Sequence, residues 1–304
     1  MLSGEKILVT GPAGQIAYPL TARLAQDNEV WGLARFSDAT SRERVDALGV
    51  TTVACDVASG DFTGVPSDFT YVLHLAAIQP PGPAYDEAIR VNAEGTGLLL
   101  AHCRRATAAL VMSSHSVYRP NPDASHAYAE TDPLGDASPP HSPPYSVSKL
   151  AQEAVARYCA RAYDLPVVLA RMNSAYGPNG GLPMLHLDAI LEGRDVVTRH
   201  DPCTYSPIHE DDIAAQVPAL LDAAAVPAFL VNWCGDEAVS VQDWCGMFGD
   251  LTGIAPNVVV REMPGTQPSA IADPTRRASV TGPCRATWRD GMTTAAKTRM
   301  AARA

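Results

Sequence analysis

The chain has 304 residues, of which 46% are hydrophobic and 18% are charged, the mix of an ordinary globular protein. Its formal charge of −10, with no basic stripe, argues against nucleic acid and anionic membranes as partners. Seven cysteines with no Cys-x-x-Cys pair indicate buried thiols in a reducing compartment and argue against a zinc site.

The first residues lead directly into a predicted strand, without the basic and apolar segments of a leader peptide. No stretch of 18 apolar residues occurs, so no membrane span is predicted. We therefore expect a cytoplasmic protein.

Short apolar runs alternate with helix-length amphipathic stretches through the first half of the chain. Strands are predicted at 6–10, 29–34, 51–55, 71–77, 109–113 and 166–171, and helices near 14–26, 40–48, 84–104 and 145–163. Continuous apolar strands separated by helices are typical of a parallel sheet that is covered on both faces. The predicted fold class is α/β, a doubly wound parallel sheet of the Rossmann type.

The alternation becomes irregular after Arg171. Helices are predicted near 184–193, 210–224 and 241–252, strands at 228–233 and 257–263, and long proline-rich loops at 119–144 and 264–283. Loops of that length inside a compact domain are more often functional than idle. We predict a main domain over 1–172 and a smaller α+β lobe over 173–304 that is interleaved with it.

A glycine-rich turn, residues 10–17, follows the first strand and opens the first helix. Gly11 and Gly14 allow a tight turn and a close approach to a pyrophosphate, and the helix N-terminus offers free N–H groups. Ala17 is small enough for the helix to pack near the strand. A plain tight turn is the alternative, but its place after the first of several parallel strands favours dinucleotide binding.

The end of the second strand bears on the choice of dinucleotide. NAD-selective sites of this kind place a carboxylate there to bind the ribose hydroxyls, whereas this chain has Ala34 and Arg35. A guanidinium suits a 2′-phosphate, so we expect NADP to be preferred over NAD, with Arg35 on the phosphate and Ser37 assisting. The alternative is that Arg35 is a solvated charge.

Tyr145 and Lys149 lie one helical turn apart at the start of a predicted helix, and the chain has two other lysines, Lys6 and Lys297. A tyrosine phenol has an ordinary pKa near 10. An ammonium and a cationic nicotinamide close by favour the phenolate, so we expect the pKa of Tyr145 to be lowered. Arginine, with its broad planar fork, is a poorer point charge for this purpose.

Ser114 ends the fifth predicted strand, at the edge where catalytic groups gather in open α/β sheets. A hydroxyl there can hold a substrate oxygen while Tyr145 exchanges its proton. Ser113 and Ser116 are the alternatives.

Several segments in the right order resemble the extended short-chain dehydrogenase/reductase family, usually called the NAD-dependent epimerase/dehydratase family. They span residues 10–17, 55–57, 73–77, 91–96, 113–118, 145–149, 171–178, 208–214, 230–244 and 287–292. The resemblance implies a catalytic triad of Ser114, Tyr145 and Lys149, and a homodimer formed through helices 84–104 and 145–163. With the glycine turn, it implies cofactor contacts by Gly11, Gly14, Gln15, Ile16, Arg35, Asp56, Val57, Leu75, Ala76, Ala77, Asn92, Lys149 and Met172.

Departures from the family pattern narrow the reaction. Dehydratases carry acidic residues just after the serine or threonine, whereas this chain has His115 and Ser116, which argues against sugar 4,6-dehydration. His115 is an acid or base by its ordinary pKa, but a structural histidine is the favoured interpretation.

The usual sugar-nucleotide contacts are also altered. Ser174 stands where an asparagine is usual, with Asn173 beside it. Tyr205 stands at or near the position of one usual arginine, and Met263 stands at the position of another. A diphosphate without guanidinium partners leaves much of its charge to water, so NDP-sugars are disfavoured. Arg194, Arg199 and Arg261 are alternatives for an acidic substrate. We expect substrate contacts by Ser114, His115, Ser174 and Tyr205.

Three hypotheses follow. The favoured one is an NAD(P)-dependent ketoreductase or alcohol dehydrogenase acting on a small molecule, with Tyr145 as acid/base. The second is an NAD-dependent sugar or sugar-nucleotide epimerase that keeps its cofactor bound. The third is a non-catalytic NADP-binding sensor.

Overall fold

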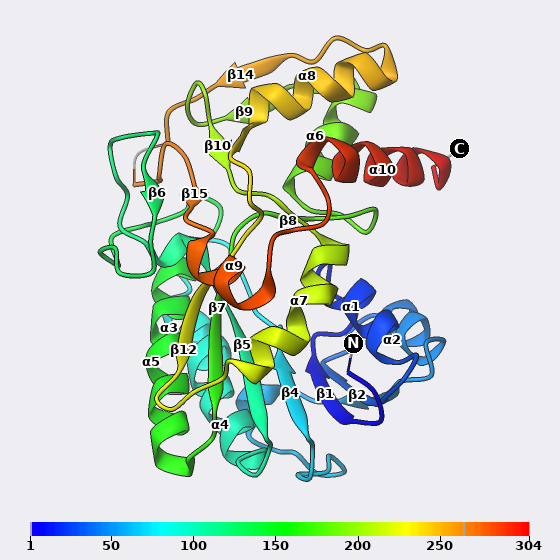
Figure 1. The fold of residues 1–304 in the computed structure, drawn as a ribbon, viewed down its shortest axis with the longest axis vertical. Helices are drawn as coiled ribbons and strands as arrows, with labels where there is room; N and C mark the ends of the chain where they lie inside the picture. The colour runs from blue at the N-terminus through cyan, green and yellow to red at the C-terminus, as the bar shows by residue number, and fades with distance from the viewer. Residues whose placement is uncertain (1, 264, 304) are drawn as a thin grey trace. The chain divides into compact units, whose positions relative to one another are not determined.

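A computed structural model describes residues 2–263 and 265–303 (Figure 1). A seven-stranded sheet has the strand order β12-β7-β5-β4-β1-β2-β3. Its strands are β1 (Lys6–Thr10), β2 (Glu29–Ala34), β3 (Thr51–Ala54), β4 (Tyr71–His74), β5 (Ala108–Ser114), β7 (Val167–Met172) and β12 (Phe229–Trp233). Ile7 of β1 pairs in parallel with Val30 and Tyr71. The order reverses direction at β1 and β4, as in doubly wound sheets, which confirms the predicted fold class.

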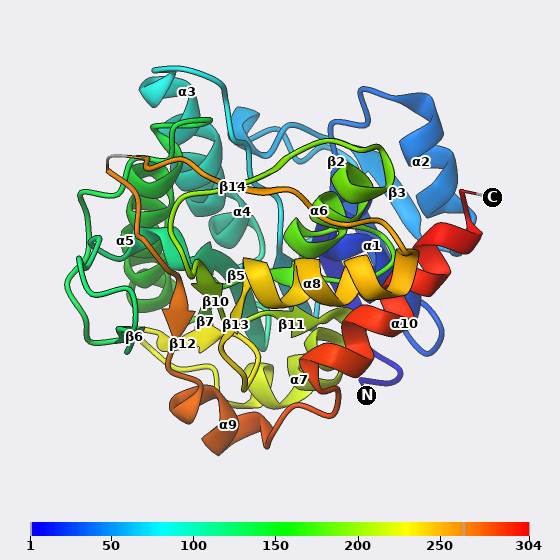
Figure 2. The same cartoon turned by 90° about the horizontal axis from the view of Figure 1, so that it is seen from above.

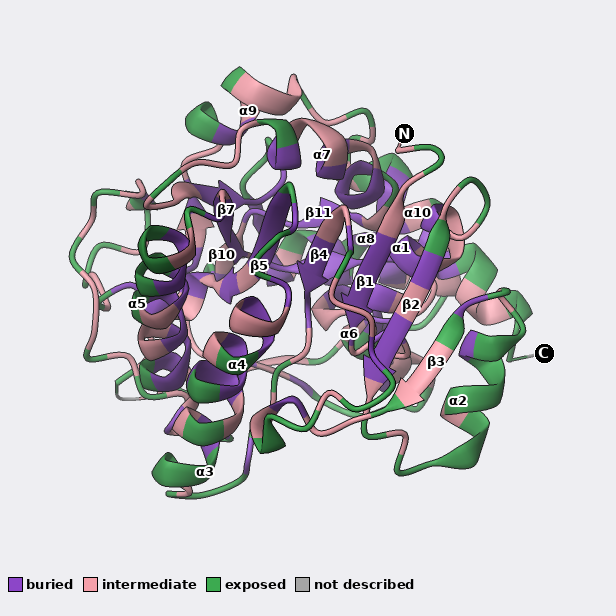
Figure 3. Ribbon diagram, turned by 90° about the horizontal axis from the view of Figure 1, so that it is seen from below, coloured by how far each residue is buried: buried purple, intermediate pink, exposed green. Residues whose placement is uncertain are grey.

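Two layers of helices cover the sheet. Their elements are α1 (Ala17–Leu24), α2 (Ala39–Asp46), η1 (Val57–Ser59), α3 (Tyr85–Ile89), η2 (Arg90–Glu94), α4 (Gly95–His102), η3 (His115–Val117), α5 (Tyr145–Tyr163) and α7 (Glu210–Asp222). Helices α3, α4 and α5 pack together on one face, and α7 lies on the other (Figures 1 and 3). The core between them includes Leu8, Val72, Leu99, Val111 and Leu169, all fully buried. Strands buried on both faces explain why they are apolar at nearly every position.

The chain divides into two compact units. The first comprises 1–117, 138–171 and 214–231, and the second 118–137, 172–213 and 232–304. We predicted a main domain over 1–172 and a smaller lobe over 173–304 that is interleaved with it. The assignment of the first to cofactor binding and of the second to substrate binding stays a prediction.

The second unit is built from short strands and helices around its own core. Its elements are β6 (Ala127–Tyr128), β8 (Ala175–Tyr176), α6 (Leu182–Leu191), β9 (Val196–Thr198), β10 (Thr204–Tyr205), β11 (Ile208–His209), β13 (Val239–Ser240), α8 (Val241–Thr252), β14 (Val258–Val260), β15 (Ile271–Ala272), α9 (Thr275–Thr281) and α10 (Trp288–Ala301). Helices α6, α8 and α10 pack together (Figure 2) around Trp244, Phe248 and Met292.

The structure differs from the sequence-based expectations at three helices, and seven short strands were not predicted: β6, β8, β9, β10, β11, β13 and β15. The predicted helix 84–104 is interrupted by the π-helical segment η2. Helix α9 lies inside the proline-rich segment 264–283, of which Pro264 is outside the described residues. Helix α10 was not predicted at all. No helix in the described part of the chain is long and apolar enough to cross a membrane.

Candidate active site

The glycine turn between β1 and α1 is shaped by close contact with the loop after β4. Gly11 has a φ of +66°, and a Cβ there would lie 3.2 Å from the Cα of Ala76. The Gly11 N–H donates to the Leu33 carbonyl at 2.7 Å. Helix α1 begins after Ile16 with no side chain capping its N-terminus. The Tyr18 N–H of its first turn donates to the Gly14 carbonyl at 2.9 Å, and the positive end of the helix faces the turn.

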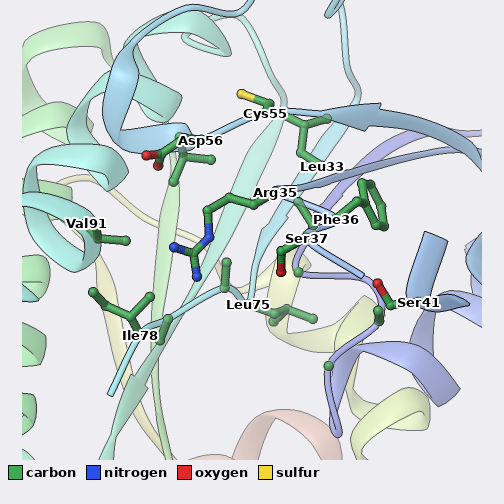
Figure 4. A pocket seen from close by; sticks show the side chains of 17 residues that line it. Leu33, Arg35, Phe36, Ser37, Ser41, Cys55, Asp56, Leu75, Ile78 and Val91 are labelled. Atoms are coloured by element: carbon green, nitrogen blue, oxygen red, sulfur yellow. The ribbon is translucent and has the colours of Figure 1, made fainter. Parts of the chain in front are cut away.

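A cavity of about 490 Å³ lies beside this turn (Figure 4). It is lined by Gly11, Ala13, Gly14, Leu33, Ala34, Arg35, Phe36, Ser37, Ser41, Cys55, Asp56, Val57, Leu75, Ala76, Ala77, Ile78 and Val91. Eight of the predicted cofactor residues are among them. The glycine backbone and the apolar walls fit a dinucleotide.

Arg35 follows the last residue of β2, and its side chain extends among the lining residues (Figure 4). Within the described ranges it makes no ion pair or hydrogen bond. Asp56 is the one acidic residue lining the cavity. Its carboxylate accepts from the Ala58 N–H at 3.0 Å and lies 3.9 Å from Arg90. The positive charge of Arg35 is therefore available to a phosphate.

The structure brings Ser114 and Tyr145 together. Ser114 is the last residue of β5, Tyr145 is the first of α5, and the Tyr145 hydroxyl lies near enough to the side chains of Ser114 and Gln79 for both to influence its pKa. The Ser114 Oγ also lies 2.9 Å from that of Ser116. Burial raises the pKa of Tyr145 above its ordinary value, while the side chains of Ser114 and Gln79 act to lower it. In the chain alone, the pKa of Tyr145 therefore shifts in the direction opposite to the one we expected.

Lys149 lies one turn further along α5 and is completely buried. Its Nζ is 5.9 Å from the centroid of the Tyr145 ring. It donates to the Met112 carbonyl at 2.8 Å and to Gln152 Oε1 at 2.9 Å. Burial lowers the pKa of Lys149 to about 7, with the charge of Glu153 acting in the other direction. The lysine is thus close to its titration midpoint at neutral pH.

The remaining predicted cofactor residues are not among those lining the cavity. Gln15 and Ile16 precede α1, and Met172 ends β7 and is buried. Asn92 holds the loop after β4, because its Oδ1 accepts from the Ile78 N–H at 2.8 Å and its Nδ2 donates to the Ile78 carbonyl at 3.0 Å. Asn92 thereby supports a wall of the cavity.

The predicted substrate contacts fall in both units. In the first, His115 begins η3 and is buried. In the second, Ser174 follows β7 and Tyr205 ends β10. Ser174 is 8% exposed, and its Oγ has no hydrogen-bond partner among the described residues. Burial raises the pKa of Tyr205 to about 12.

Both polar side-chain atoms of Asn173 bond to the backbone, which leaves one Nδ2 hydrogen. Its Nδ2 donates to the Ala270 carbonyl at 2.7 Å, and its Oδ1 accepts from the backbone N–H groups of Ser174 and Ser206. The neighbouring asparagine is thus committed to the backbone.

The three arginines considered for an acidic substrate differ. Arg194 is paired with Glu192 at 2.6 Å, and Arg261 is exposed. Arg199 lies over the Tyr205 ring, 5.3 Å from its centroid, and its buried Nε has no hydrogen-bond partner in the described part of the chain. Of the three, Arg199 is the one with an unused donor beside a predicted substrate residue.

Sequence reasoning missed Gln79, a second side chain near the Tyr145 hydroxyl. It lies in the loop after β4, and His141 Nε2 lies 3.2 Å from its Oε1. It also missed a buried ion pair behind Ser114. Arg171 Nη2 lies 2.8 Å from Glu153 Oε2, and Ser113 donates to Glu153 Oε1 at 2.6 Å. The signal was present for Arg171, which stands within the strongly apolar strand β7.

No group of three or more His, Cys, Asp or Glu side chains that could hold a metal ion occurs in the part of the chain described. All seven cysteines are free; five are buried, as predicted, whereas Cys55 and Cys284 are partly exposed.

Two curated proteins are similar in sequence to part of this chain. L-arabinose 1-dehydrogenase (NAD(P)(+)) from Haloferax volcanii is 32% identical over 177 residues, which are 55% of this chain and 66% of that protein. A trifunctional UDP-glucose 4,6-dehydratase, epimerase and reductase from Arabidopsis thaliana is 27% identical over 192 residues, which are 58% of this chain and 28% of that protein. The matches thus cover less than two thirds of these curated relatives.

Solved structures share the whole fold. UDP-glucuronic acid 4-epimerase from Bacillus cereus, in complex with UDP-glucuronic acid and NAD, has a TM-score of 0.84 at 23% identity, over 98% of this chain and 99% of that one. MoeE5 in complex with UDP-glucose and NAD has a TM-score of 0.82 at 26% identity, over 98% of this chain and 100% of that one. The family model described as "NAD dependent epimerase/dehydratase family" matches residues 7–216, more than half of the chain. The chain therefore belongs to the NAD-dependent epimerase/dehydratase family, whose members are NAD(P)-dependent enzymes.

Proposed function

We propose that this chain is an NAD(P)-dependent ketoreductase or alcohol dehydrogenase in which Tyr145 is the acid/base. The observation that carries the proposal is the proximity of the Tyr145 hydroxyl to Ser114 at the end of β5, with Lys149 on the next helical turn. Catalytic groups in open α/β sheets gather at this edge.

The chain's own residues have distinct roles. Ser114 donates a hydrogen bond to the substrate oxygen, and Tyr145 gives or takes the proton on that oxygen. Lys149 carries the positive charge that stabilises the Tyr145 phenolate. The glycine turn, Arg35 and the cavity walls hold the dinucleotide, which supplies hydride transfer at a carbinol or carbonyl carbon when bound. His115 and Ser174 are proposed to contact the substrate, with Tyr205.

NADP is the proposed cofactor, with NAD as a weaker alternative. Arg35 is the cation in the cavity, it lacks a protein partner among the described residues, and Ser37 lines the same cavity. A planar guanidinium binds a phosphate through two donors.

A screen at 340 nm over hydroxy and keto compounds, including free sugars, with NADP and NAD tests the proposal. We expect the wild-type protein to consume cofactor with at least one substrate. The Tyr145→Phe variant should not consume cofactor with that substrate. Turnover that is unchanged in Tyr145→Phe contradicts the role of Tyr145.

The second candidate is a sugar or sugar-nucleotide epimerase, favoured by solved neighbours that contain UDP-sugars and NAD. Such an enzyme purifies with bound nicotinamide and shows no net change at 340 nm while a sugar epimer accumulates. The commitment of Asn173 to the backbone and the tyrosine at position 205 argue against a UDP-sugar. A non-catalytic NADP sensor binds NADP and is indifferent to Tyr145→Phe in every assay.

A homodimer and a cytoplasmic location belong to the same proposal. Leu98, Val147 and Tyr158 are exposed on α4 and α5, the helices expected to pair. We expect sedimentation equilibrium to show a dimer that Tyr158→Asp weakens, because a carboxylate in an apolar contact is costly. A wild-type protein that sediments as a monomer contradicts the proposed homodimer.

A further inference from the structure

Gln152 lies in the interior of the first unit, three residues after Lys149 on α5, with no exposed surface. Its Oε1 accepts from Lys149 Nζ at 2.9 Å, and its Nε2 donates to Thr96 Oγ1 at 2.9 Å. A buried amide that bridges two elements in this way is held in one orientation.

The orientation follows from counting hydrogens. The single Thr96 hydroxyl proton is donated to the Asn92 carbonyl at 2.7 Å, so Thr96 Oγ1 accepts from its other two neighbours, Gln152 Nε2 and His74 Nε2. The amide nitrogen of Gln152 therefore faces Thr96, and its carbonyl oxygen faces the lysine.

The same count of hydrogens leads from Thr96 through His74 to Thr10, the first residue of the glycine turn. His74 has its proton on Nε2, and burial lowers its pKa to about 3, so the ring is neutral. Its Nδ1 accepts from Thr10 Oγ1 at 2.8 Å, and that oxygen accepts from the Leu75 and Ala76 N–H groups at 3.1 Å. Two runs of hydrogen bonds, one from the wall of the cofactor cavity and one from Lys149, thus meet at Thr96.

We propose that Gln152 is the positioning residue for Lys149: its carbonyl, aimed by Thr96, fixes the lysine nitrogen with a neutral acceptor and leaves one N–H for the active site. The inference rests on the proposed role of Lys149. The nitrogen has three donors, of which Met112 and Gln152 take two.

Other charged or titratable groups around Lys149 are already engaged or neutral. On α5, Glu153 is bonded to Arg171 of β7 and to Ser113 of β5, and the Tyr145 ring is 5.9 Å away. On β4, His74 is neutral. A neutral acceptor at position 152 therefore leaves the charge of Lys149 responsive to pH near neutrality, whereas a carboxylate there would keep it protonated.

The chain has three lysines, so the charge of Lys149 can be followed directly by NMR of the protein labelled with ¹³C at lysine Cε. Lys6→Arg and Lys297→Arg assign the two other signals. We expect the Lys149 signal to titrate near neutral pH. Gln152→Glu should raise its midpoint by about 1 pH unit or more, and Gln152→Met should lower it, because the ammonium loses an acceptor.

Ala154→Glu is the matched control, since it adds the same charge to the exposed face of α5 and should leave the midpoint unchanged. Midpoints that stay at the wild-type value in both Gln152 variants overturn the inference. If Gln152→Glu does not fold, the volume-conserving Gln152→Met decides alone.

Kinetics separate this inference from the proposed function. If hydride transfer is found, the pH profile of kcat should move with the Lys149 midpoint, while the KM for NADP stays near the wild-type value. A drop in kcat without movement of the profile indicates a merely structural role and contradicts the positioning role. If no hydride transfer is found but the midpoints shift, the proposed function fails and the control of Lys149 by Gln152 stands.

Discussion

At the scale of single residues, Arg35 separates the two cofactors. Arg35→Ala should lower kcat/KM for NADP by about 10- to 100-fold and change the value for NAD little, because a charge-assisted hydrogen-bond partner contributes about 1.5–3 kcal/mol. Arg104→Ala, an exposed arginine that does not line the cavity, is the control. Equal losses for NADP and NAD contradict a contact with the 2′-phosphate.

The buried charge of Lys149 should appear in stability as a function of pH. Its pKa is about 7 in the folded chain and 10.5 ordinarily, so below pH 7 both states hold the proton and the cost of burial is fully present. Between these values only the unfolded chain holds it, and stability rises with pH.

Urea unfolding of wild type and Lys149→Met measures this contribution. The free energy of unfolding of wild type should gain about 2 kcal/mol relative to the variant between about pH 7 and pH 9. Parallel profiles for the two proteins would show that the lysine is not buried as described.

Single residues also show where sequence reasoning ends. The proximity of Ser114, Tyr145 and Lys149 was predictable, because strand ends and helical spacing place side chains by rule. Gln79 was not, since its position depends on the conformation of an irregular loop. The low pKa of Lys149 was not either, because desolvation depends on everything packed around the nitrogen.

At the scale of elements, the buried pair Glu153–Arg171 ties α5 to β7. Arg171→Met leaves the Glu153 carboxylate without its cation, which should cost about 3–5 kcal/mol in the free energy of unfolding. The double variant Glu153→Met/Arg171→Met should recover much of that loss. Arg194→Met, in a pair that is more than half exposed at the arginine, should change it by less than about 1 kcal/mol. A double variant as unstable as the single one contradicts this account.

The strands of the seven-stranded sheet were easier to predict than the short strands and the last two helices. The boundaries of β1 and β2 agree with the apolar runs, because the strands are buried on both faces. Helix α10 is largely polar, and its inward positions Met292, Ala295 and Ala296 form a weak apolar stripe. Its start was readable, since the Thr287 side chain accepts from the Asp290 N–H at the N-terminus.

At the scale of the whole molecule, the fold is shared with solved NAD-containing enzymes over nearly the full chain, while the residues that contact the substrate are proposals. Ser174, Tyr205 and Arg199 all lie in the second unit, where short strands and irregular segments carry little sequence periodicity. Fold and cofactor class were thus predictable, and the substrate was not, because function resides in sites placed on a common scaffold.

The most direct test of the central claim is kcat/KM of Tyr145→Phe on a substrate found in the 340 nm screen, measured with the Kd for NADP. The account predicts a loss of at least about 100-fold in kcat/KM, with NADP binding unchanged within about threefold, since only the proton on the phenol is removed. A variant that keeps kcat/KM within about threefold of wild type would contradict the assignment of Tyr145 as the acid/base.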